Sequence, residues 1–265
     1  MNFLSVSKIV VGVGTMFFLL APLAAILPLA FTDSVFLNYP ITGYSFRWFS
    51  ELVSDEVWRR AIVNSLVIGS GTTVLASFLG TLAALGLRGQ TSSWLFAFAR
   101  TAFLLPMVSP AVVLGVGMQL MFGRYNLTNS YAGVVIAHTV IAVPFVVINV
   151  LAVLQAIDPR LEQAAASLGA RPSTTLLRVT LPLAAPGIIS GAVFAFATSL
   201  DEVVLTLFVA GPNQRTLARQ MFASIRENIS PSIAAAALIF ILGTITVATI
   251  LAALRLYRKP ARVVT

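Results

Sequence analysis

Two adjacent carboxylates, Asp201 and Glu202, interrupt the apolar stretch FATSLDEVVLTLFVAGP. A carboxylate inside a membrane span costs about 2.5 kcal/mol or more unless it faces protein or water, so the pair is a candidate functional site. Neighbouring helical residues point about 100° apart, and we therefore expect only one of the two to face a polar path. With Ser199 beside them, they are interpreted as lining a path or gate. In the alternative, they pair with an arginine of a neighbouring subunit or contact another protein.

The residue types that carry metal or phosphate chemistry are scarce. The chain has no cysteine, and its single histidine, His138, has no second histidine with which to share a metal ion. We expect His138 to be a satisfied polar packing residue rather than a proton relay. The only lysines, Lys8 and Lys259, lie near the chain ends and follow no glycine-rich turn, so no phosphate-binding loop is present. The sequence therefore predicts neither an enzyme nor a chain that binds a cofactor or metal.

A polar segment, residues 155–182, separates two apolar runs and must lie outside the hydrocarbon. Asp158 followed by Pro159 predicts a capped helix that continues to about Leu168, and Gly169 supplies the left-handed residue that ends it. Apolar and small side chains recur at i, i+3, i+4 and i+7, which suits a partner's groove. They are Leu161, Ala164, Ala165 and Leu168. The alternative is an amphipathic helix lying on the membrane surface.

The same segment resembles the EAA loop of binding-protein-dependent ABC importer permeases, whose pattern is E-A-A-x3-G-x9-I-x-L-P. Here the pattern reads QAA, then Gly169, then V-x-L-P ending at Pro182, with Gln163 replacing the glutamate and Glu162 just before it. The resemblance implies a coupling helix that docks into a cytoplasmic ATPase. The residues assigned to this contact are Glu162, Gln163, Ala164, Ala165, Leu168, Gly169 and Arg171. Whether Glu162 or Gln163 makes the polar contact stays open.

The elements that position these residues are membrane spans. Of 265 residues, 58% are hydrophobic and 10% charged, whereas a soluble domain carries about 25% charge. Six segments are long enough to cross a core of about 30 Å. They are predicted at 9–31, 62–87, 99–122, 133–154, 184–211 and 233–256. The fold prediction is all-α and polytopic. The resemblance implies the type I ABC importer fold, with one transmembrane permease domain over residues 1–265.

Basic residues indicate the orientation of the spans. With a cytoplasmic N-terminus, ten of the 17 basic residues fall on the inside and seven on the outside, and both termini are inside. The net charge of +8 is scattered over loops rather than clustered, which argues against nucleic acid. Outside, residues 32–60 mix aromatic and acidic side chains, as a helix at the membrane interface does. The alternatives for this segment are a helix beside a binding protein and a simple aromatic anchor.

Further stretches resemble the spermidine/putrescine-type subgroup of these permeases, namely SLDEVVLTLFVAGP with TLARQMFASIRENISPSIAA, and YSFRWFSELVSDEVWRRAIVNSLVIG. The resemblance implies the permease subunit of an ATP-driven importer in the bacterial inner membrane, with a polyamine as the leading solute. Opines, aminoethylphosphonate and amino-acid-like solutes are alternatives. The implied partners are a homologous permease, two copies of an ATPase that holds ATP and Mg, an extracytoplasmic binding protein and membrane lipid.

Two rival functions are weighed against an importer permease. A secondary transporter would need ion-coupling carboxylates within a repeated bundle, and no duplicated half is seen in this sequence. A structural or channel-like subunit would carry no docking loop of this spacing. Both rivals are therefore less favoured than an importer permease.

Overall fold

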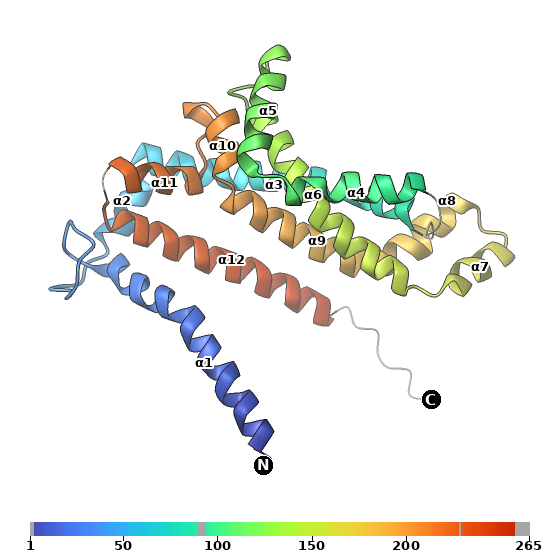
Figure 1. The fold of residues 1–265 in the computed structure, drawn as a ribbon, viewed down its shortest axis with the longest axis horizontal. Helices are drawn as coiled ribbons and strands as arrows, with labels where there is room; N and C mark the ends of the chain where they lie inside the picture. The colour runs from blue at the N-terminus through green and yellow to red at the C-terminus, as the bar shows by residue number, and fades with distance from the viewer. Residues whose placement is uncertain (1–2, 89–93, 228, 258–265) are drawn as a thin grey trace. The chain divides into compact units, whose positions relative to one another are not determined.

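The structure, a computed structural model, describes residues 3–88, 94–227 and 229–257, without the side chains of residues 3–6, 247, 248 and 250–257. Within these residues every regular element is a helix, as the composition predicted (Figure 1). The chain forms two compact units. One comprises Met1–Arg59 with Gln220–Thr244, and the other comprises Arg60–Arg219 with Ile245–Thr265. The prediction of one permease domain over residues 1–265 stays a prediction.

The first unit is built on long apolar helices. Helix α1 (Phe3–Ile26) exposes every side chain described from residue 7 to residue 26 and continues into the 3-10 turn η1 (Leu27–Phe31). Helix α12 (Ser232–Tyr257) begins in this unit, as does most of α11 (Leu217–Glu227). A run of exposed apolar side chains of this length is stable against lipid or another protein rather than water, so α1 agrees with the predicted first span.

The segment 32–60 contains the expected short helix, α2 (Arg47–Ser54). The indole Nε1 of Trp48 donates to the carbonyl of Thr32 at 2.8 Å, which ties the helix to the start of its own loop. On the same segment, the hydroxyl of Ser232 donates to the carboxylate of Glu51 at 2.8 Å. These contacts fix α2 within the first unit, and its place at a membrane interface stays a prediction.

The core of the second unit lies between α6 (Tyr131–Ala156) and α9 (Leu181–Asp201), which run side by side in Figure 1. Helix α6 is apolar on all sides and is buried along most of its length. Two glycines of α9 allow the close approach. A Cβ added at Gly187 would lie 2.8 Å from the carbonyl oxygen of Asn149, and one at Gly191 would lie 2.8 Å from the Cα of Val146. Small residues four apart are the usual means of packing membrane helices closely.

Replacing Gly191 by valine is expected to destabilise the α6–α9 pair, because the new side chain meets backbone that cannot rotate away. Overpacking of this kind costs about 1–3 kcal/mol. The measurement is the thermal unfolding midpoint of the purified protein in detergent. Gly86→Val is the matched control, since an added Cβ there meets no atom within 4 Å. Equal midpoints for the two variants would contradict the close-packing role of Gly191.

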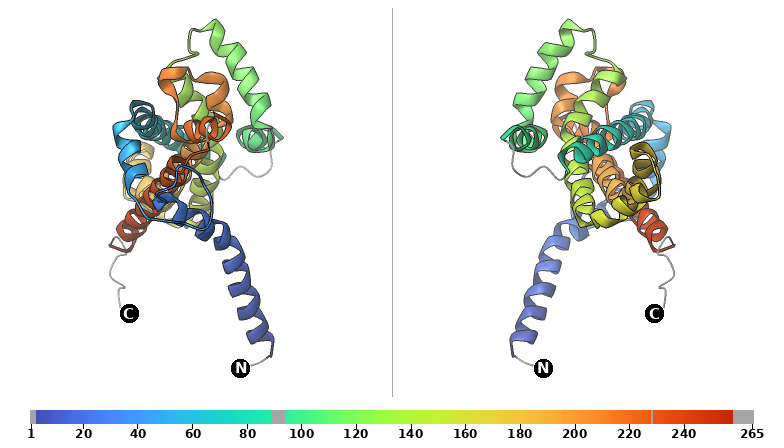
Figure 2. Two further views of the ribbon diagram at one scale, coloured as in Figure 1. Left: turned by 90° about the vertical axis from the view of Figure 1, so that its left-hand side faces the viewer. Right: turned by 90° about the vertical axis from the view of Figure 1, so that its right-hand side faces the viewer.

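Two of the predicted spans are broken. Residues 99–122 form two helices, α4 (Trp94–Val108) and α5 (Ala111–Arg124), which meet at a bend of 103°, and Figure 2 shows α5 rising steeply from α4. Pro110 explains the break, because proline disfavours helical backbone at Ser109 and has no N–H to donate. The expectation of one continuous helix over residues 184–211 is also wrong, since α9 ends at Asp201 and α10 (Val204–Val209) follows.

Among the residues that the structure describes, four helices are long and apolar enough to cross a membrane, or five if the bent pair α4–α5 is one span. They include α1 with η1, α3 (Glu56–Leu87), α6, and the run of helix that ends with α9. Helix α12 adds a shorter apolar stretch, Ser232–Thr246, among the residues whose side chains are described. Each of the six predicted segments therefore lies mostly in helix.

Candidate functional site

The polar segment folds as its sequence predicts. Helix α7 (Pro159–Ser167) begins at Asp158, whose carboxylate accepts a hydrogen bond from the backbone N–H of Arg160 at 2.9 Å. Gly169 follows the helix with a φ of +82°, and its N–H donates to the carbonyl of Ala166 at 2.9 Å. The next N–H, from Ala170, reaches back to Ala165 at 3.1 Å. This pair of bonds is a left-handed glycine cap, and it fixes the direction in which the chain leaves α7.

The outer face of α7 has no cover from the part of the chain that the structure describes. Leu168 is 90% exposed and Leu161 is 48% exposed. The predicted stripe, here called the docking stripe, consists of Leu161, Ala164, Ala165 and Leu168. Only Ala165 among these is half-buried, and Gln163 and Arg171 are exposed. An apolar stripe on an exposed loop helix is suited to enter a groove of another protein.

Glu162 points into the chain instead. Its Oε1 forms an ion pair with the guanidinium of Arg88 and accepts a hydrogen bond from the hydroxyl of Thr180 at 2.6 Å. The hydrogen bond from Thr180 lowers the pKa of Glu162 below its ordinary value of 4.5, and the hydrogen bond and charge of Arg88 act in the same direction. The carboxylate is therefore ionised at neutral pH. Of the two residues considered for the polar contact to a partner, Glu162 is engaged internally, whereas Gln163 is exposed.

Thr180 is brought to Glu162 by a widened turn. After the short helix α8 (Pro172–Thr175), the chain forms a π-helical turn, η2 (Leu176–Thr180), in which the N–H of Leu181 donates to the carbonyl of Leu176. Pro182 explains this geometry, because it has no N–H and its ring would clash with the carbonyl four residues earlier in a regular helix. The Leu-Pro of the motif thus shapes the turn that carries Thr180.

Arg88, Glu162 and Thr180 are here called the linkage cluster. Arg88 follows the last residue of α3, Glu162 lies in the first turn of α7, and Thr180 immediately precedes α9. The three residues line a groove of about 480 Å³. The cluster joins α7 to two long helices, α3 and α9. Sequence reasoning took Arg88 only as a topology signal and did not single out Thr180.

The acidic pair lies at the break between α9 and α10, at the opposite end of α9 from α7 (Figure 1). Asp201 is exposed. Glu202 is half-buried, and its Oε1 accepts a hydrogen bond from the backbone N–H of Leu205 at 2.7 Å. Glu202 therefore caps the short helix α10. The prediction that both carboxylates lie on one continuous helix is wrong, because the helix breaks between them and α10. Of the two side chains, only that of Glu202 accepts the hydrogen bond that starts α10.

His138 holds the two sides of the break together. It is fully buried, with Nδ1 at 2.8 Å from the hydroxyl of Ser199 and Nε2 at 3.0 Å from that of Thr206. The hydroxyl of Thr206 also donates to the carbonyl of Glu202 at 3.0 Å, so this contact reaches the residue at the break itself. His138 is thus a satisfied packing residue, as predicted. Ser199, predicted beside a path, is buried against His138.

Beyond α10, a polar cluster holds the following loop. The amide nitrogen of Asn64 donates to the carbonyls of Asn213 and Arg215 at 2.8 and 2.9 Å, and Tyr131 donates to its amide oxygen at 2.7 Å. Asn64 is 2% exposed, so each of these bonds satisfies a buried group. Among the described residues, no group of three or more histidine, aspartate or glutamate side chains is arranged to hold a metal ion.

Comparison with known proteins gives matches over most of the chain. The family described as "Binding-protein-dependent transport system inner membrane component" matches residues 76–259. The putrescine transport system permease protein PotI of Escherichia coli K12 is 33% identical over 240 residues, covering 86% of this chain and 83% of the relative. The molybdenum transport system permease protein ModB of Mycobacterium bovis is 34% identical over 237 residues, covering 82% and 89%.

Solved structures share the fold. A bacterial ABC transporter that imports the acidic polysaccharide alginate has a chain that matches with a TM-score of 0.75 at 18% identity, covering 96% of both chains. The alginate transporter in complex with an alginate-bound periplasmic protein matches with a TM-score of 0.74 at 17% identity, covering 97% of this chain and 96% of the other.

Proposed function

The chain belongs to the family of binding-protein-dependent transport system inner membrane components and is a permease of the ABC importer type, and on this premise we propose that its solute is a polyamine such as putrescine or spermidine. The observation that carries the proposal is the similarity to a putrescine permease over 86% of the chain. The exposed carboxylate of Asp201 at the α9–α10 break supports it, because a negative charge lowers the cost of passing a polycation.

Reconstitution of the complete importer in vesicles tests this solute. The expected result is ATP-dependent uptake of labelled putrescine or spermidine that needs the binding protein and is competed by unlabelled polyamine. The similarity to a molybdenum permease makes an anionic solute, opposite in charge to a polyamine, the specific alternative. Uptake of molybdate, or of a neutral solute, that polyamines do not compete would overturn the polyamine proposal and leave the importer class intact.

The proposed energy source is a pair of cytoplasmic ATPase subunits that hold ATP and Mg. The docking stripe of α7 suits a groove on the ATPase, and Gln163 and Arg171 are exposed beside it. In this proposal, α7 and both chain ends lie on the cytoplasmic side of the bacterial inner membrane. A homologous permease supplies the second half of the path. The extracytoplasmic partner is a solute-binding protein, as in the alginate transporter complex.

The linkage cluster is proposed to transmit motion of α7 to the long helices. When the ATPase moves α7, the ion pair of Glu162 with Arg88 pulls on the end of α3, and its hydrogen bond with Thr180 pulls on the start of α9. Two points of attachment on different helices convert a shift of α7 into a relative movement of α3 and α9. Glu162 is a positioning residue in this scheme.

Glu162→Ala is therefore expected to lower transport roughly fivefold or more, the lower range of allosteric coupling, while the ATPase still binds the complex. The stability of the permease should fall by at most about 1 kcal/mol, because the pair is partly exposed. The measurement is solute uptake divided by ATP hydrolysed. Arg88→Ala should give a similar loss, and the double variant should be no worse than either single one. Additive losses would contradict a shared role.

The effect of this pair should not depend on pH in the neutral range. Because the pKa of Glu162 is lowered in the folded chain, its stabilisation is fully present above the ordinary value of 4.5 and is lost as the pH falls through the lowered value. The stability difference between wild type and Glu162→Ala should be constant from about pH 6 to 8 and shrink below about pH 4.5. Thermal unfolding over this range measures it, and a difference that changes near pH 7 would contradict this assignment.

A further inference from the structure

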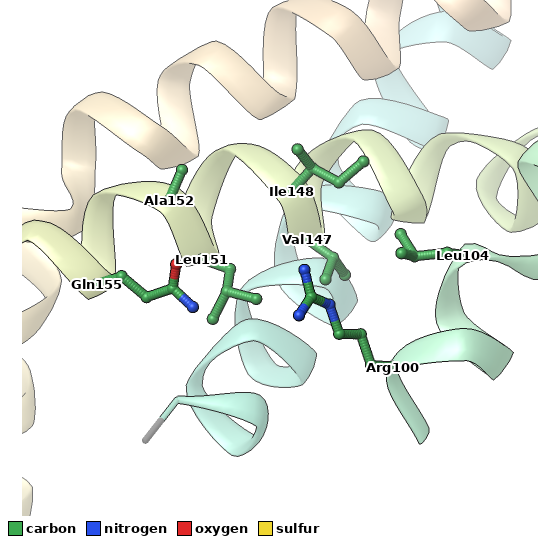
Figure 3. Close-up of a pocket in the computed structure, with 7 residues that line it drawn as sticks. All are labelled: Arg100, Leu104, Val147, Ile148, Leu151, Ala152 and Gln155. Carbon is green, nitrogen blue, oxygen red and sulfur yellow. The ribbon is translucent and has the colours of Figure 1, made fainter. Parts of the chain in front are cut away.

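A crevice between α4 and α6 has no part in the sites above. Its volume is about 170 Å³, and its walls are apolar side chains of both helices (Figure 3). On α6, Val147 and Leu151 are buried beneath it, and on α4 Leu104 is half-buried. The crevice opens outward, since Ile148 and Ala152 at its edge are exposed. It is therefore an apolar-floored recess on a surface of the second unit.

Two polar side chains enter this recess. Figure 3 shows the guanidinium of Arg100 and the amide of Gln155 reaching toward the same space above Leu151. Neither side chain forms a hydrogen bond or ion pair with any residue that the structure describes. None of the described residues that line the recess is acidic. A guanidinium with five donors and no carboxylate among these residues is suited to bind an anion from elsewhere.

The depth of the recess limits what that anion can be. Gln155 is the last residue but one of α6, and α6 leads directly into α7. From Ile148 to Gln155 the helix rises about 10 Å, so the recess lies at the level where headgroups meet acyl chains. Under the orientation proposed above, this is the cytoplasmic leaflet, whose negative surface potential comes from anionic phospholipids.

We propose that Arg100 and Gln155 bind the phosphate of an anionic phospholipid in the cytoplasmic leaflet, with an acyl chain lying along Leu104, Ile148 and Leu151. The guanidinium supplies charge and paired donors for phosphate oxygens, and the Gln155 amide supplies a further donor. The apolar wall explains why the ligand is a lipid rather than a free phosphate. A cationic solute is disfavoured here by the charge of Arg100. The inference rests on the proposed orientation and not on the identity of the solute.

The test uses the complete importer complex reconstituted in vesicles of phosphatidylcholine that contain phosphatidylglycerol. After detergent extraction, native mass spectrometry counts the phosphatidylglycerol molecules that stay with the permease. Arg100→Gln is expected to lower this retention about fivefold, the effect of one basic residue at an anionic surface. Arg100→Lys should retain most of it. Arg178→Gln is the control, because Arg178 is an exposed arginine of the same proposed cytoplasmic side that does not line the recess.

Unchanged retention in Arg100→Gln would overturn the proposal, as would an equal loss in Arg178→Gln, which would indicate diffuse surface charge. If the Arg100→Gln complex loses the homologous permease but keeps its phosphatidylglycerol, a protein rather than a lipid occupies the recess. Competition by glycerol phosphate in solution would show a free-anion site. If Arg100→Gln does not accumulate, Gln155→Leu decides the question, since removing the amide should also lower retention. None of these readouts requires transport, so they stand apart from the test of the polyamine proposal.

Discussion

Replacing Gly169 by valine is expected to lower transport and solute-stimulated ATP hydrolysis about tenfold, while the permease still folds and enters the membrane. Gly169 has a φ of +82°, where an ordinary side chain costs about 1–2 kcal/mol and a β-branched one costs more. An added Cβ would meet no atom within 4 Å, so the effect is conformational and not a clash. The strained residue should abandon the left-handed cap and move the exit of α7, which turns the docking stripe away from the ATPase.

Gly169→Asn is the matched variant, because asparagine tolerates the left-handed region better than valine does. Gly169→Asn should therefore retain most of the coupling, even though it also adds a side chain at this position. Uptake and ATP hydrolysis of the reconstituted complex, normalised to the amount of assembled importer, measure both variants. Wild-type coupling in a well-assembled Gly169→Val complex would remove the glycine cap from the mechanism.

If Asp201 lines the solute path, Asp201→Asn is expected to lower uptake of a polyamine about tenfold, equivalent to about 1.4 kcal/mol, because it removes the attraction between the carboxylate and the cation. Glu202→Gln should change uptake less than Asp201→Asn does. The amide oxygen of glutamine can still accept the hydrogen bond from Leu205 that starts α10. Neither change should alter the affinity of the separate binding protein.

Uptake in vesicles with each variant decides between the two carboxylates. A greater loss of uptake from Glu202→Gln than from Asp201→Asn would show that the charge of the capping residue matters more than that of the exposed carboxylate. Equal and near wild-type uptake for both would remove the acidic pair from the mechanism, and with it the physical support for a cationic solute. Glu202→Ala separates the structural effect, because it deletes the cap while leaving Asp201 in place.

The features predicted well from the sequence are those that neighbouring residues determine. Asp158, Pro159 and Gly169 act on the backbone beside them, so α7 and its cap follow from local chemistry. The linkage cluster was not predicted, because Arg88 is 74 residues from Glu162 and Thr180 is 18 residues away. No local pattern specifies such pairings. Their geometry depends on how α3, α7 and α9 pack.

The helix breaks show a second limit, which is specific to membrane chains. An apolar run reads the same whether its helix is continuous or broken, and the carboxylates of Asp201 and Glu202 were interpreted as path residues rather than as the end of a helix. Glu202 caps α10 through a local hydrogen bond to Leu205, whereas His138 bridges Ser199 to Thr206 from α6 through tertiary contacts that no local pattern specifies. Pro110 explains a break in the third span, but a proline does not specify an angle of 103°.

The π-helical turn at Leu176–Thr180 explains the spacing of the motif as well as its residue types. Nine residues separate Gly169 from Val179, and the widened turn uses one residue more than a regular turn does. Deleting a residue here would have one of two outcomes. If the widened turn persists, the residues before it rotate by about 100° around the helix axis relative to α9. If it collapses to a regular turn, the ring of Pro182 meets a carbonyl. Natural selection should therefore tolerate insertions and deletions between Gly169 and Val179 less than it tolerates substitutions there.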